Sequence, residues 1–237
     1  MPADGNIRIL KGRYKLPNNA EFLGYWFSDQ RDGIGCEIFP DGSKLEGYWR
    51  NGIQSGNGRI IYSDGSYFEG GLYNALRQGY GKIIYKDGTT YEGAWDDDKK
   101  EGDGFETFPD GSIYQGTFRN GKMEGKGIYT FDNGSQYSGA FLNNKYNGCG
   151  IFKWPNGKAF QGMWRNNKRH GRGELTYLNG KTYYGEYVKG KRHGLGKLSF
   201  KNKSSLIGIW NNGKLKGKCI YTYKTIEGNN AITIKIF

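Results

Sequence analysis

A repeat of 23 residues runs through almost the whole chain, and it constrains the fold more than any other feature. Nine rows follow one another without insertion or deletion. The rows begin at Phe22, Leu45, Phe68, Tyr91, Tyr114, Tyr137, Phe160, Tyr183 and Leu206. A fixed period of this length is typical of repeat arrays, in which each unit packs against its neighbours instead of joining one globular core.

Glycines and aromatic residues hold fixed positions in these rows. Counting the first residue of a row as position 1, Gly occupies positions 3 and 12 in all nine rows and position 14 in eight, with Cys219 the exception. Position 18 is aromatic in every row. Position 5 is aromatic in eight rows, as Trp26, Trp49, Trp95, Phe118, Phe141, Trp164, Tyr187 and Trp210. The 41 glycines, far above the usual ~7% of residues, therefore belong to an ordered pattern.

The spacing within a row predicts two short β-strands. Positions 1, 3 and 5 alternate with mostly polar or small residues, and positions 14, 16 and 18 repeat the spacing of two that is typical of strands. A glycine between two rings leaves a space over the backbone that a ring from the adjacent strand can fill. We therefore expect a side chain at Gly93 to take the space that its neighbour's ring needs.

Two kinds of connection join these strands. Pro17, Pro40, Pro109 and Pro155 stand directly before Asp or Asn, and in the last three Gly follows. This order predicts a tight hairpin turn with a type I turn and a glycine bulge. The other connection, such as residues 120–125, is predicted to be a polar loop with two glycines. Glycine recurs too often for any window of a row to favour a helix.

The pattern as a whole predicts an all-β fold, an elongated antiparallel meander of stacked β-hairpins in a single twisted sheet. Residues 1–21 are predicted to form an N-terminal partial repeat, residues 22–205 eight full repeats, and residues 206–237 a degenerate ninth repeat with a C-terminal strand. Residues 231–237 alternate apolar and polar side chains. This last strand either caps its own array or pairs with a partner chain.

The net charge of +12 is unevenly distributed. Residues 1–113 carry 13 Lys and Arg against 18 Asp and Glu, whereas residues 114–237 carry 22 against 5. Such asymmetry indicates charged partners and says little about the fold. The N-terminus shows no signal peptide, no apolar run approaches the ~20 residues of a membrane span, and the three cysteines fall in unrelated row positions. We therefore expect a cytoplasmic protein in a reducing compartment.

The fourth row carries the clearest form of the motif. It reads Tyr91-Glu92-Gly93-Ala94-Trp95, then Gly102-Asp103-Gly104, then Phe108-Pro109-Asp110-Gly111. This row closely resembles the MORN (membrane occupation and recognition nexus) repeat. The resemblance covers residues 22–224, with a partial match from residue 10, and departs from the pattern at Leu72 and in the ninth row.

The resemblance implies an array of β-hairpins that is used as a non-catalytic scaffold. Similar arrays occur in radial-spoke head proteins of cilia, in apicomplexan cytoskeletal proteins and in junctophilins that bridge membranes. They also occur beside catalytic domains in some kinases and methyltransferases, and this chain shows no such domain.

Three stretches come close to a phosphate-binding loop: residues 116–123, 185–192 and 208–215. Each has the spacing of the glycines and the Lys, but none has the Ser or Thr that would hold Mg²⁺ or the strand-to-helix junction that such a loop needs. All three also fall in the same register of the repeat, which points to a turn between strands. We expect no nucleotide cofactor.

The sequence offers two candidate metal sites, and neither has the spacing or the residues that a metal site needs. His170 and His193 occupy the same position of successive rows, so they should lie about 10 Å apart, too far to share a zinc ion. Residues 96–98 are three successive aspartates, but the stretch lacks the Gly and the terminal Glu of a calcium loop. We expect no metal, no catalytic residues and no enzymatic activity.

Two sets of residues are predicted to bind partners. The first is a basic ridge in the same turn of rows seven to nine, formed by Lys168, Arg169, Lys191, Arg192, Lys214 and Lys216. The ridge serves either solubility alone or docking on an acidic surface. The second is the aromatic face formed by the eight position-5 rings, which would offer pockets to an extended or helical segment of a partner.

The predicted function is a structural scaffold that binds protein partners in a larger assembly. A cytoskeletal complex such as a ciliary or flagellar axoneme is the sharper prediction, because chains built from this repeat alone resemble radial-spoke components. The alternative is a membrane tether that binds acidic phospholipids through the basic C-terminal half. Self-association through residues 231–237 is a further option, and nucleic acid is not expected as a partner.

Overall fold

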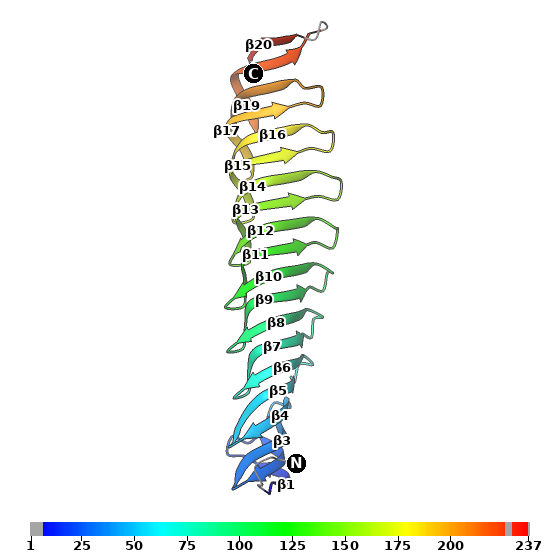
Figure 1. The fold of residues 1–237 in the computed structure, drawn as a ribbon, viewed down its shortest axis with the longest axis vertical. Helices are drawn as coiled ribbons and strands as arrows, with labels where there is room; N and C mark the ends of the chain where they lie inside the picture. The colour runs from blue at the N-terminus through cyan, green and yellow to red at the C-terminus, as the bar shows by residue number, and fades with distance from the viewer. Residues whose placement is uncertain (1–6, 226–228, 237) are drawn as a thin grey trace. The chain divides into compact units, whose positions relative to one another are not determined.

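The protein is built from β-strands in two compact units. The computed structural model describes residues 7–225 and 229–236, and no helix occurs among these residues. Unit 1 spans Met1–Gly121 and unit 2 spans Lys122–Phe237. Figure 1 shows the strands of each unit side by side in chain order.

The described strands of unit 1 are β1 (Ile9–Lys15), β2 (Glu21–Phe27), β3 (Gln30–Ile38), β4 (Lys44–Arg50), β5 (Ile53–Ile61), β6 (Tyr67–Tyr73), β7 (Leu76–Ile84), β8 (Thr90–Asp96), β9 (Lys99–Thr107) and β10 (Ile113–Arg119). Those of unit 2 are β11 (Lys122–Thr130), β12 (Gln136–Leu142), β13 (Lys145–Lys153), β14 (Ala159–Arg165), β15 (Lys168–Thr176), β16 (Thr182–Val188), β17 (Lys191–Ser199), β18 (Ser205–Asn211), β19 (Lys214–Lys224) and β20 (Asn230–Ile236).

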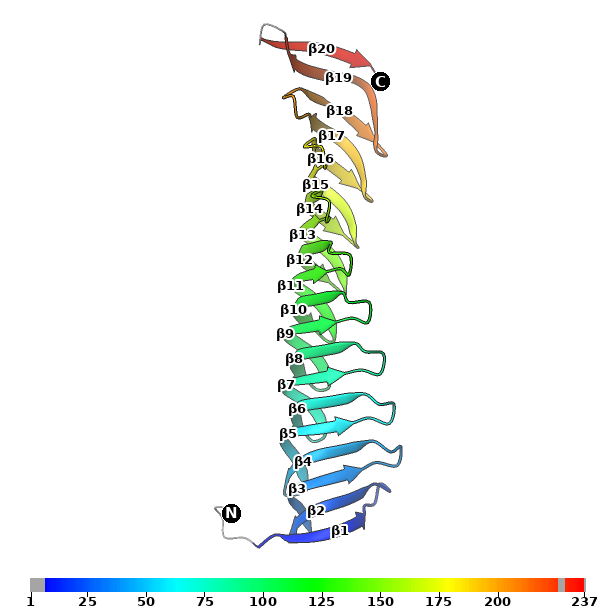
Figure 2. The ribbon, with the colours of Figure 1, turned by 90° about the vertical axis from the view of Figure 1, so that its right-hand side faces the viewer.

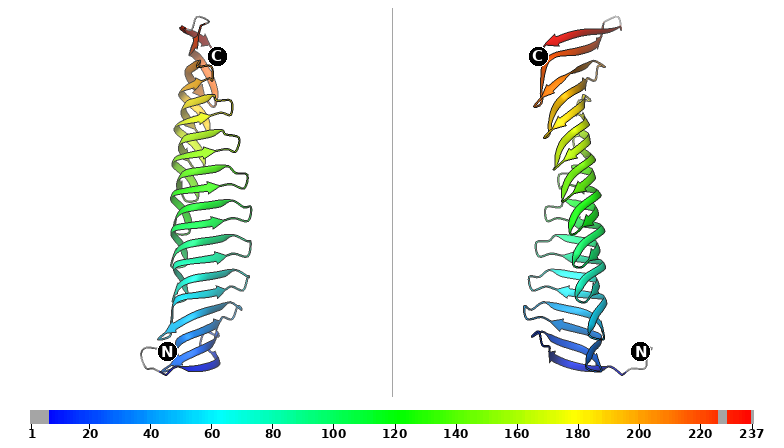
Figure 3. Two further views of the ribbon diagram at one scale, coloured as in Figure 1. Left: turned by 45° about the vertical axis from the view of Figure 1, so that its right-hand side comes forward. Right: turned by 90° about the vertical axis from the view of Figure 1, so that its left-hand side faces the viewer.

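Within each unit, every strand pairs with the next one along the chain, and every pairing is antiparallel. This holds from β1 to β10 in unit 1. It holds from β11 to β20 in unit 2. The side views in Figures 2 and 3 show the same order of strands in each unit. The predicted all-β antiparallel meander is therefore confirmed.

The terminal segments add one strand at each end. In the described part of residues 1–21, β1 pairs with β2 and shows an irregular register between Lys11 and Tyr14. At the other end, β20 pairs with β19 over seven residue pairs, from Lys218–Ile236 to Lys224–Asn230. The C-terminal tail therefore pairs with its own array. Phe237, the last residue of the predicted tail strand, lies outside the described residues.

The two kinds of connection lie at opposite ends of the strands. Figure 1 shows the longer loops along one side of each unit. In these longer loops the prediction is confirmed. The Phe108 N–H donates to the Ser112 carbonyl and the Gly111 N–H donates to the Phe108 carbonyl, both at 2.9 Å. Gly111 has a φ of 86°, which is the left-handed conformation of a type I turn that ends in a glycine bulge.

The other connection is shorter than expected. Only two residues join the strands within each row, and both have positive φ, as for Asn143 (50°) and Asn144 (62°). Two successive positive φ angles define a type I′ turn, whose twist matches that of antiparallel strands. The prediction of a polar loop at residues 120–125 is therefore wrong: Asn120 and Gly121 form the turn, and β11 begins at Lys122.

The core of each unit is a chain of aromatic rings that belong to positions 1 and 5. Tyr91 contacts Trp95 of its own row and Phe118 of the next row, both edge to face, with ring centroids 5.1 and 5.0 Å apart. In unit 2, Phe160 contacts Trp164 and Tyr187 in the same way at 5.2 and 5.1 Å. Because Tyr91 and Phe160 each touch two position-5 rings, the contact that closes such a row also joins it to the next one.

The glycines at positions 3 and 14 make room for the position-1 ring. A Cβ added at Gly104 would lie 2.5 Å from a ring carbon of Tyr91, and one added at Gly93 would lie 2.6 Å from the Gly104 Cα and from the Tyr91 hydroxyl. The expectation of a ring over bare backbone is thus met with one correction. The ring over Gly93 comes from its own strand, two residues earlier, and folds back across the cross-strand glycine pair.

Hydrogen bonds fix these buried rings in place. The Tyr91 hydroxyl donates to the Ala94 carbonyl at 2.8 Å, and the Tyr137 hydroxyl donates to the Ala140 carbonyl at 2.9 Å. The Trp95 indole N–H donates to the carbonyl of Gly81, at position 14 of the preceding row, at 3.1 Å. These bonds satisfy polar groups inside the core, whereas the indole N–H groups of Trp26 and Trp210 and the hydroxyl of Tyr187 have no hydrogen-bond partner among the described residues.

Replacing Gly93 by Val should lower the free energy of unfolding by about 3 kcal/mol, because the added methyl groups have no room between Tyr91 and Gly104. Denaturant titration followed by tryptophan fluorescence measures the loss. The matched control is Gln115→Val, which adds the same side chain at an exposed strand position of the same unit and should cost less than about 0.5 kcal/mol. Equal losses in both variants would contradict the role of the glycine pair.

The protein should lose stability in base. Burial raises the pKa of Tyr137 and of Tyr183 to about 12. A pKa above the unfolded value of about 10 stabilises the folded state fully below pH 10, and this stability is lost as the pH rises from 10 through 12. Thermal melts between pH 9 and 12 should show this decline, and Tyr183→Phe should reduce it. A Tyr183→Phe variant with an unchanged decline would speak against titration of this ring.

Candidate interaction surfaces

The eight position-5 rings lie in the core. Their side chains are at most 7% exposed, from Trp49 at 0% to Trp164 at 7%. They contact the position-1 rings, and in this arrangement a partner segment cannot reach them. The hypothesis that they form an open aromatic face is therefore corrected: the residues that alternate with glycine serve the packing between rows, and the open face is the opposite one.

The six residues of the predicted basic ridge fall into two groups. Lys168, Lys191, Lys214 and Lys216 are exposed. The two arginines of the ridge, Arg169 and Arg192, are half-buried because their guanidinium groups cover the aromatic chain. Arg192 lies 4.0 Å from the Trp210 ring centroid, and Arg169 lies 5.1 Å from that of Tyr187. The structure thus brings the lysines together as an exposed row and assigns the arginines to packing.

Position 10 plays this covering role in several rows. In unit 1, Arg77 lies 4.2 Å from the Trp95 ring centroid and Lys100 lies 4.8 Å from that of Tyr91. Each position-10 arginine also reaches the next turn: Arg169 donates to the Gly190 carbonyl and Arg192 to the Gly213 carbonyl, both at 2.9 Å. The side chain therefore links two rows while its cation interacts with the ring faces.

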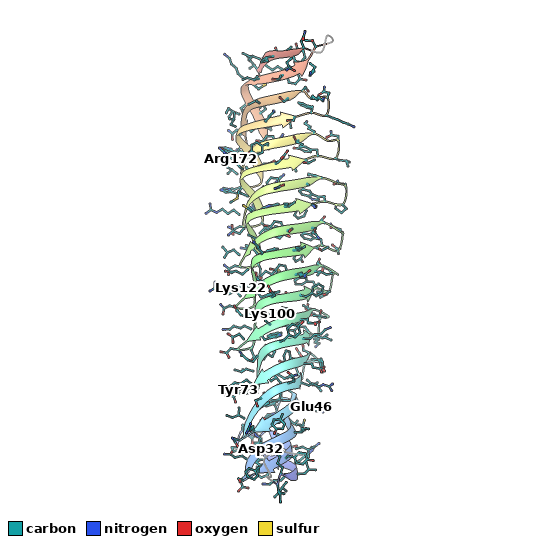
Figure 4. All side chains as sticks on the ribbon, in the orientation of Figure 1. Asp32, Glu46, Tyr73, Lys100, Lys122 and Arg172 are labelled. Carbon is teal, nitrogen blue, oxygen red and sulfur yellow. The ribbon has the colours of Figure 1, made fainter. Side chains whose placement is uncertain are left out.

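The exposed lysines occupy position 9, the first residue of the second strand of each row. In unit 2 the row continues beyond the predicted ridge and consists of Lys122, Lys145, Lys168, Lys191 and Lys214, all of them exposed. Figure 4 labels Lys122 at the start of β11. None of the five forms an ion pair with a carboxylate among residues 7–225 and 229–236. Unit 2 as a whole carries 21 Lys and Arg against 5 Asp and Glu.

The open face of unit 1 contains a groove with a glycine floor. We call it the outer groove of unit 1; it has a volume of about 730 Å³. Its floor includes Gly24, Gly35, Gly47, Gly58 and Gly70. Tyr25 and Tyr48, which are 40% and 39% exposed, lie in its wall with Leu23 and Ile34. Because the positions of the glycine pairs face the core rings, they present only backbone to the opposite surface, and the side chains that alternate with them, such as those of Tyr25 and Ile34, form the wall.

Polar groups line the same groove. Glu69 pairs with Arg59 at 3.8 Å, whereas the half-buried Glu46 forms no ion pair with another described residue. Figure 4 labels Glu46 among the side chains of unit 1. Burial and the carboxylate of Glu46 raise the pKa of the Cys36 thiol, so this cysteine stays protonated and is a poor nucleophile. The exposed rings and the unpaired carboxylate of Glu46 make the groove suited to binding.

Unit 2 has a comparable groove on its open face. One hollow of about 560 Å³ is lined by Gly150, Gly162, Gly173, Met163 and Tyr184, among others. A second hollow of about 360 Å³ continues over Gly185, Gly196 and Ile207. The charged residues of this second hollow are Arg172, Glu186 and Lys197, two basic and one acidic, whereas those of the outer groove of unit 1 are Glu46, Arg59 and Glu69, one basic and two acidic. The grooves therefore share a floor and differ in charge.

The remaining candidates from the sequence lie in turns and strands. His170 and His193 are half-buried in β15 and β17. Asp98 accepts hydrogen bonds from Arg77, so the aspartate turn is a structural link between rows. In the described part of the chain, no group of three or more His, Cys, Asp or Glu side chains is placed to hold a metal ion.

Across residues 7–225 and 229–236, the structure contains no helix with the length and apolar character that crossing a membrane requires.

Two features of the open face escaped the sequence analysis. Tyrosines replace the usual small residue at position 4 in the first two rows, as Tyr25 and Tyr48, and this departure was the signal for the groove of unit 1. The role of position 10 was also missed. Position 10 holds side chains as different as Arg77 and Tyr146, so the sequence alone does not reveal a shared role. The role becomes visible only in the structure, where both side chains lie over core rings.

Comparisons with known proteins agree with the repeat pattern. Nine stretches match the family described as MORN repeat: residues 22–44, 46–67, 68–90, 91–113, 114–136, 137–159, 160–182, 183–205 and 207–225. No curated protein gives a significant match over the sequence.

Similar solved structures include three domains of the proteins SAS-4 and CPAP. The TCP domain of Drosophila melanogaster SAS-4, solved with a proline-rich motif of Ana2, is 15% identical over 66% of this chain and 85% of that one, with a TM-score of 0.43. The TCP10 domain of Danio rerio CPAP is 11% identical over 86% and 95%, with a TM-score of 0.46. A CPAP G-box domain is 11% identical over 85% and 98%, with a TM-score of 0.47. Likenesses of this strength do not bear on the function of this chain.

Replacing Arg192 by Met should lower the free energy of unfolding by about 2 kcal/mol, because the variant loses the cation over Trp210 and the hydrogen bond to Gly213. Urea titration of the full chain measures this. Lys191→Met is the matched control, since its neighbouring side chain is exposed, and it should change stability by less than about 0.5 kcal/mol. If both variants changed the free energy of unfolding only slightly, Arg192 would have no packing role and would behave like the exposed lysines.

Proposed function

Because the chain belongs to the MORN-repeat family, whose repeat it matches nine times across residues 22–225, we propose that it is a non-catalytic scaffold that binds protein partners. The repeats supply a regular surface with few loops, and the core rings hold that surface rigid from row to row. A rigid surface with a long groove loses little conformational entropy on binding. This suits a protein that holds other chains in place.

The outer groove of unit 1 is the observation that carries the proposal. A floor without side chains lets the backbone of a partner approach the sheet closely, and Tyr25 and Tyr48 offer ring faces along the wall. Tyrosine binds partners well because it is large, rigid and amphipathic. The occupant that fits best is an extended peptide segment rather than a bulky globular surface.

The chemistry of the groove narrows this occupant further. Apolar contacts from Leu23, Ile34 and the two tyrosines favour proline or aliphatic side chains, since aromatic-lined grooves bind preformed extended segments at low entropic cost. The unpaired Glu46 carboxylate favours a Lys or Arg beside them. We therefore propose an extended partner segment that combines apolar residues with a basic one.

The setting that we propose for this scaffold is a cytoskeletal assembly, with a ciliary or flagellar axonemal complex as the specific case. The support is the resemblance to chains built from this repeat alone, which occur as radial-spoke components. Co-sedimentation of the full chain with purified axonemes tests this setting. Failure to sediment with axonemes or microtubules would count against it.

A membrane tether is the second candidate, favoured by the charge of unit 2 and its row of exposed lysines. Each basic residue near an anionic membrane surface contributes about 1 kcal/mol of attraction. Liposome flotation with and without anionic lipid separates this function from the first. Binding that disappears when Lys168 and Lys191 are reversed in charge would support the tether.

Contact with another chain through β20 is a further part of the proposal. Three isoleucines on one face of this strand, Ile232, Ile234 and Ile236, are 67–75% exposed. An exposed apolar edge strand is a template for pairing with a second chain. Size-exclusion chromatography with light scattering would show self-association through this strand as a mass that rises with concentration.

Tyr48→Ala should weaken the binding of an extended peptide with proline and arginine at least ten-fold, because the variant loses a ring from the wall of the groove. Fluorescence anisotropy with labelled peptides of alternating apolar and basic residues measures the affinity. Tyr73→Ala is the matched control: Tyr73 is 58% exposed at the turn end of β6, outside the groove, and Figure 4 labels it there.

The two variants should fold alike, which circular dichroism and melting temperature check. If a peptide bound both variants and the unchanged protein with equal affinity, the groove would not be part of the binding surface. No binding by any peptide of this class would overturn the proposed occupant.

A further inference from the structure

The half-buried cations of position 10 have counter-ions in unit 1. Arg31 pairs with Glu37 at 2.5 Å, Arg77 pairs with Asp98 at 2.8 Å, and Lys100 pairs with Glu106. A cation that is partly removed from water is stabilised by a nearby carboxylate. In unit 1 the chain supplies this carboxylate itself.

The corresponding arginines of unit 2 lack a carboxylate. Arg169 and Arg192 form no ion pair with a described residue, and their guanidinium groups bond to backbone carbonyls. The reason lies at two repeat positions. Position 16, which is Glu37 and Glu106 in unit 1, is Leu175 and Leu198 here. Position 8, which is Asp98 in the row after Arg77, is Gly190 and Gly213.

A pocket lies between these two arginines. It has a volume of about 200 Å³, and the residues around it include Arg169, Leu175, Tyr177, Tyr187, Lys191 and Arg192. Three cationic side chains therefore converge on one small hollow that has no acidic residue in its wall. All of these residues belong to unit 2, in rows seven and eight of the repeat.

The Tyr187 hydroxyl adds an unpartnered polar group. Tyr187 is 1% exposed, and its hydroxyl has no hydrogen-bond partner among the described residues. Burial raises the pKa of Tyr187, with Arg169 acting against the rise and Tyr177 adding to it. Tyr187 itself lines the pocket together with Arg169 and Tyr177, so the unpartnered hydroxyl belongs to a residue of the pocket wall. Buried hydroxyls without a partner are rare, because leaving one unpaired is costly.

We propose that this pocket binds a phosphate group, carried as a monoester on a side chain of a protein partner. Two guanidinium groups, an ammonium group and a phenol match a phosphate monoester, which carries almost two negative charges and three acceptor oxygens, better than a carboxylate, which carries one charge and two oxygens. Leu175 and Tyr177 supply an apolar wall for the carbon stem of the phosphorylated residue. Only the source of the phosphate rests on the proposed scaffold function; the affinity for phosphate itself does not.

Isothermal titration of the full chain with inorganic phosphate tests the pocket, and titration with a phosphoserine peptide tests the source. We expect one saturable site for phosphate at pH 7.5. Binding of the phosphoserine peptide should weaken several-fold at pH 5.5, because the second pKa of a phosphate monoester is about 6 and most of the groups then carry a single negative charge. The phosphoserine peptide should bind at least ten-fold more tightly than the same peptide with serine.

Tyr187→Phe is the first variant, because it removes only the hydroxyl. Its melting temperature should stay the same or rise, since no internal hydrogen bond is lost, while its affinity for phosphate should fall at least five-fold. A purely structural role of Tyr187 would not produce a loss of affinity without a loss of stability.

Leu175→Glu is the second variant. It places a carboxylate at position 16, as in the rows of Arg31 and Lys100, and should pair with Arg169 and abolish phosphate binding. Leu178→Glu is the matched control: Leu178 is 73% exposed in the next loop, so this variant adds the same charge outside the pocket and should bind phosphate within two-fold of the unchanged protein.

Three results would overturn the proposal. The first is a protein that does not bind phosphate, or binds it equally in Tyr187→Phe and Leu175→Glu. The second is phosphate binding without any preference for the phosphoserine peptide, which would leave a site for a free anion only. The third is flotation with phosphoinositide vesicles that both variants lose, with no phosphopeptide binding, which would assign the pocket to a lipid headgroup.

Discussion

The whole fold depends on an aromatic ring that lies across a pair of glycines. Tyr91 covers Gly93 and Gly104 with no space to spare, and the same ring meets Trp95 and Phe118 edge to face. One ring thereby closes its own row and joins the next. The contact works only when the two glycines and the two neighbouring rings stand at fixed offsets, so an inserted or deleted residue would break it. This explains why nine rows keep the period of 23 residues.

The residue type at position 10, whose side chain covers the core rings, varies more between rows than the rings themselves do. Position 10 is Arg77, Lys100 and Arg192 in some rows, and Tyr146 stacks on Tyr137 with centroids 3.8 Å apart in another. A cation and an aromatic ring can replace each other here because both interact well with the face of a ring. The arginines gain a second role by reaching the next turn, as Arg169 does at Gly190.

The sequence allowed much of the fold to be predicted, since the period of two within the rows and the Pro-Asp-Gly turns each have one physical meaning. The face that buries the rings was harder to judge. The pattern shows that Trp95 alternates with polar residues, but only the structure shows that the strand register shifts between Gly93 and Trp95 and that the ring of Trp95 is buried. The outer groove lies on the opposite face, and its signal in the sequence was the pair of tyrosines at position 4, Tyr25 and Tyr48.

The two-residue turns were predicted incorrectly for a different reason. Asn-Gly at residues 51–52, 120–121 and 212–213 is the usual signal for a type I′ turn, yet the glycine at position 12 suggested a loop that continued further. That glycine instead lies inside a strand, and the register shifts beside it, as between Gly162 and Trp164. A glycine in a bulged strand and a glycine in a loop look alike in sequence.

The charge of the two units differs because positions 8 and 16 vary while the ring and glycine positions do not. Glu106 and Asp98 neutralise their cations in unit 1, and Leu175 and Gly190 leave theirs exposed to external anions in unit 2. Neither substitution disturbs the stacking of rings, because these side chains lie beside the aromatic chain and not between its members. A repeat of this kind can therefore acquire a binding site in one row without losing the fold, and it does so by deleting a counter-ion rather than by adding a new cation.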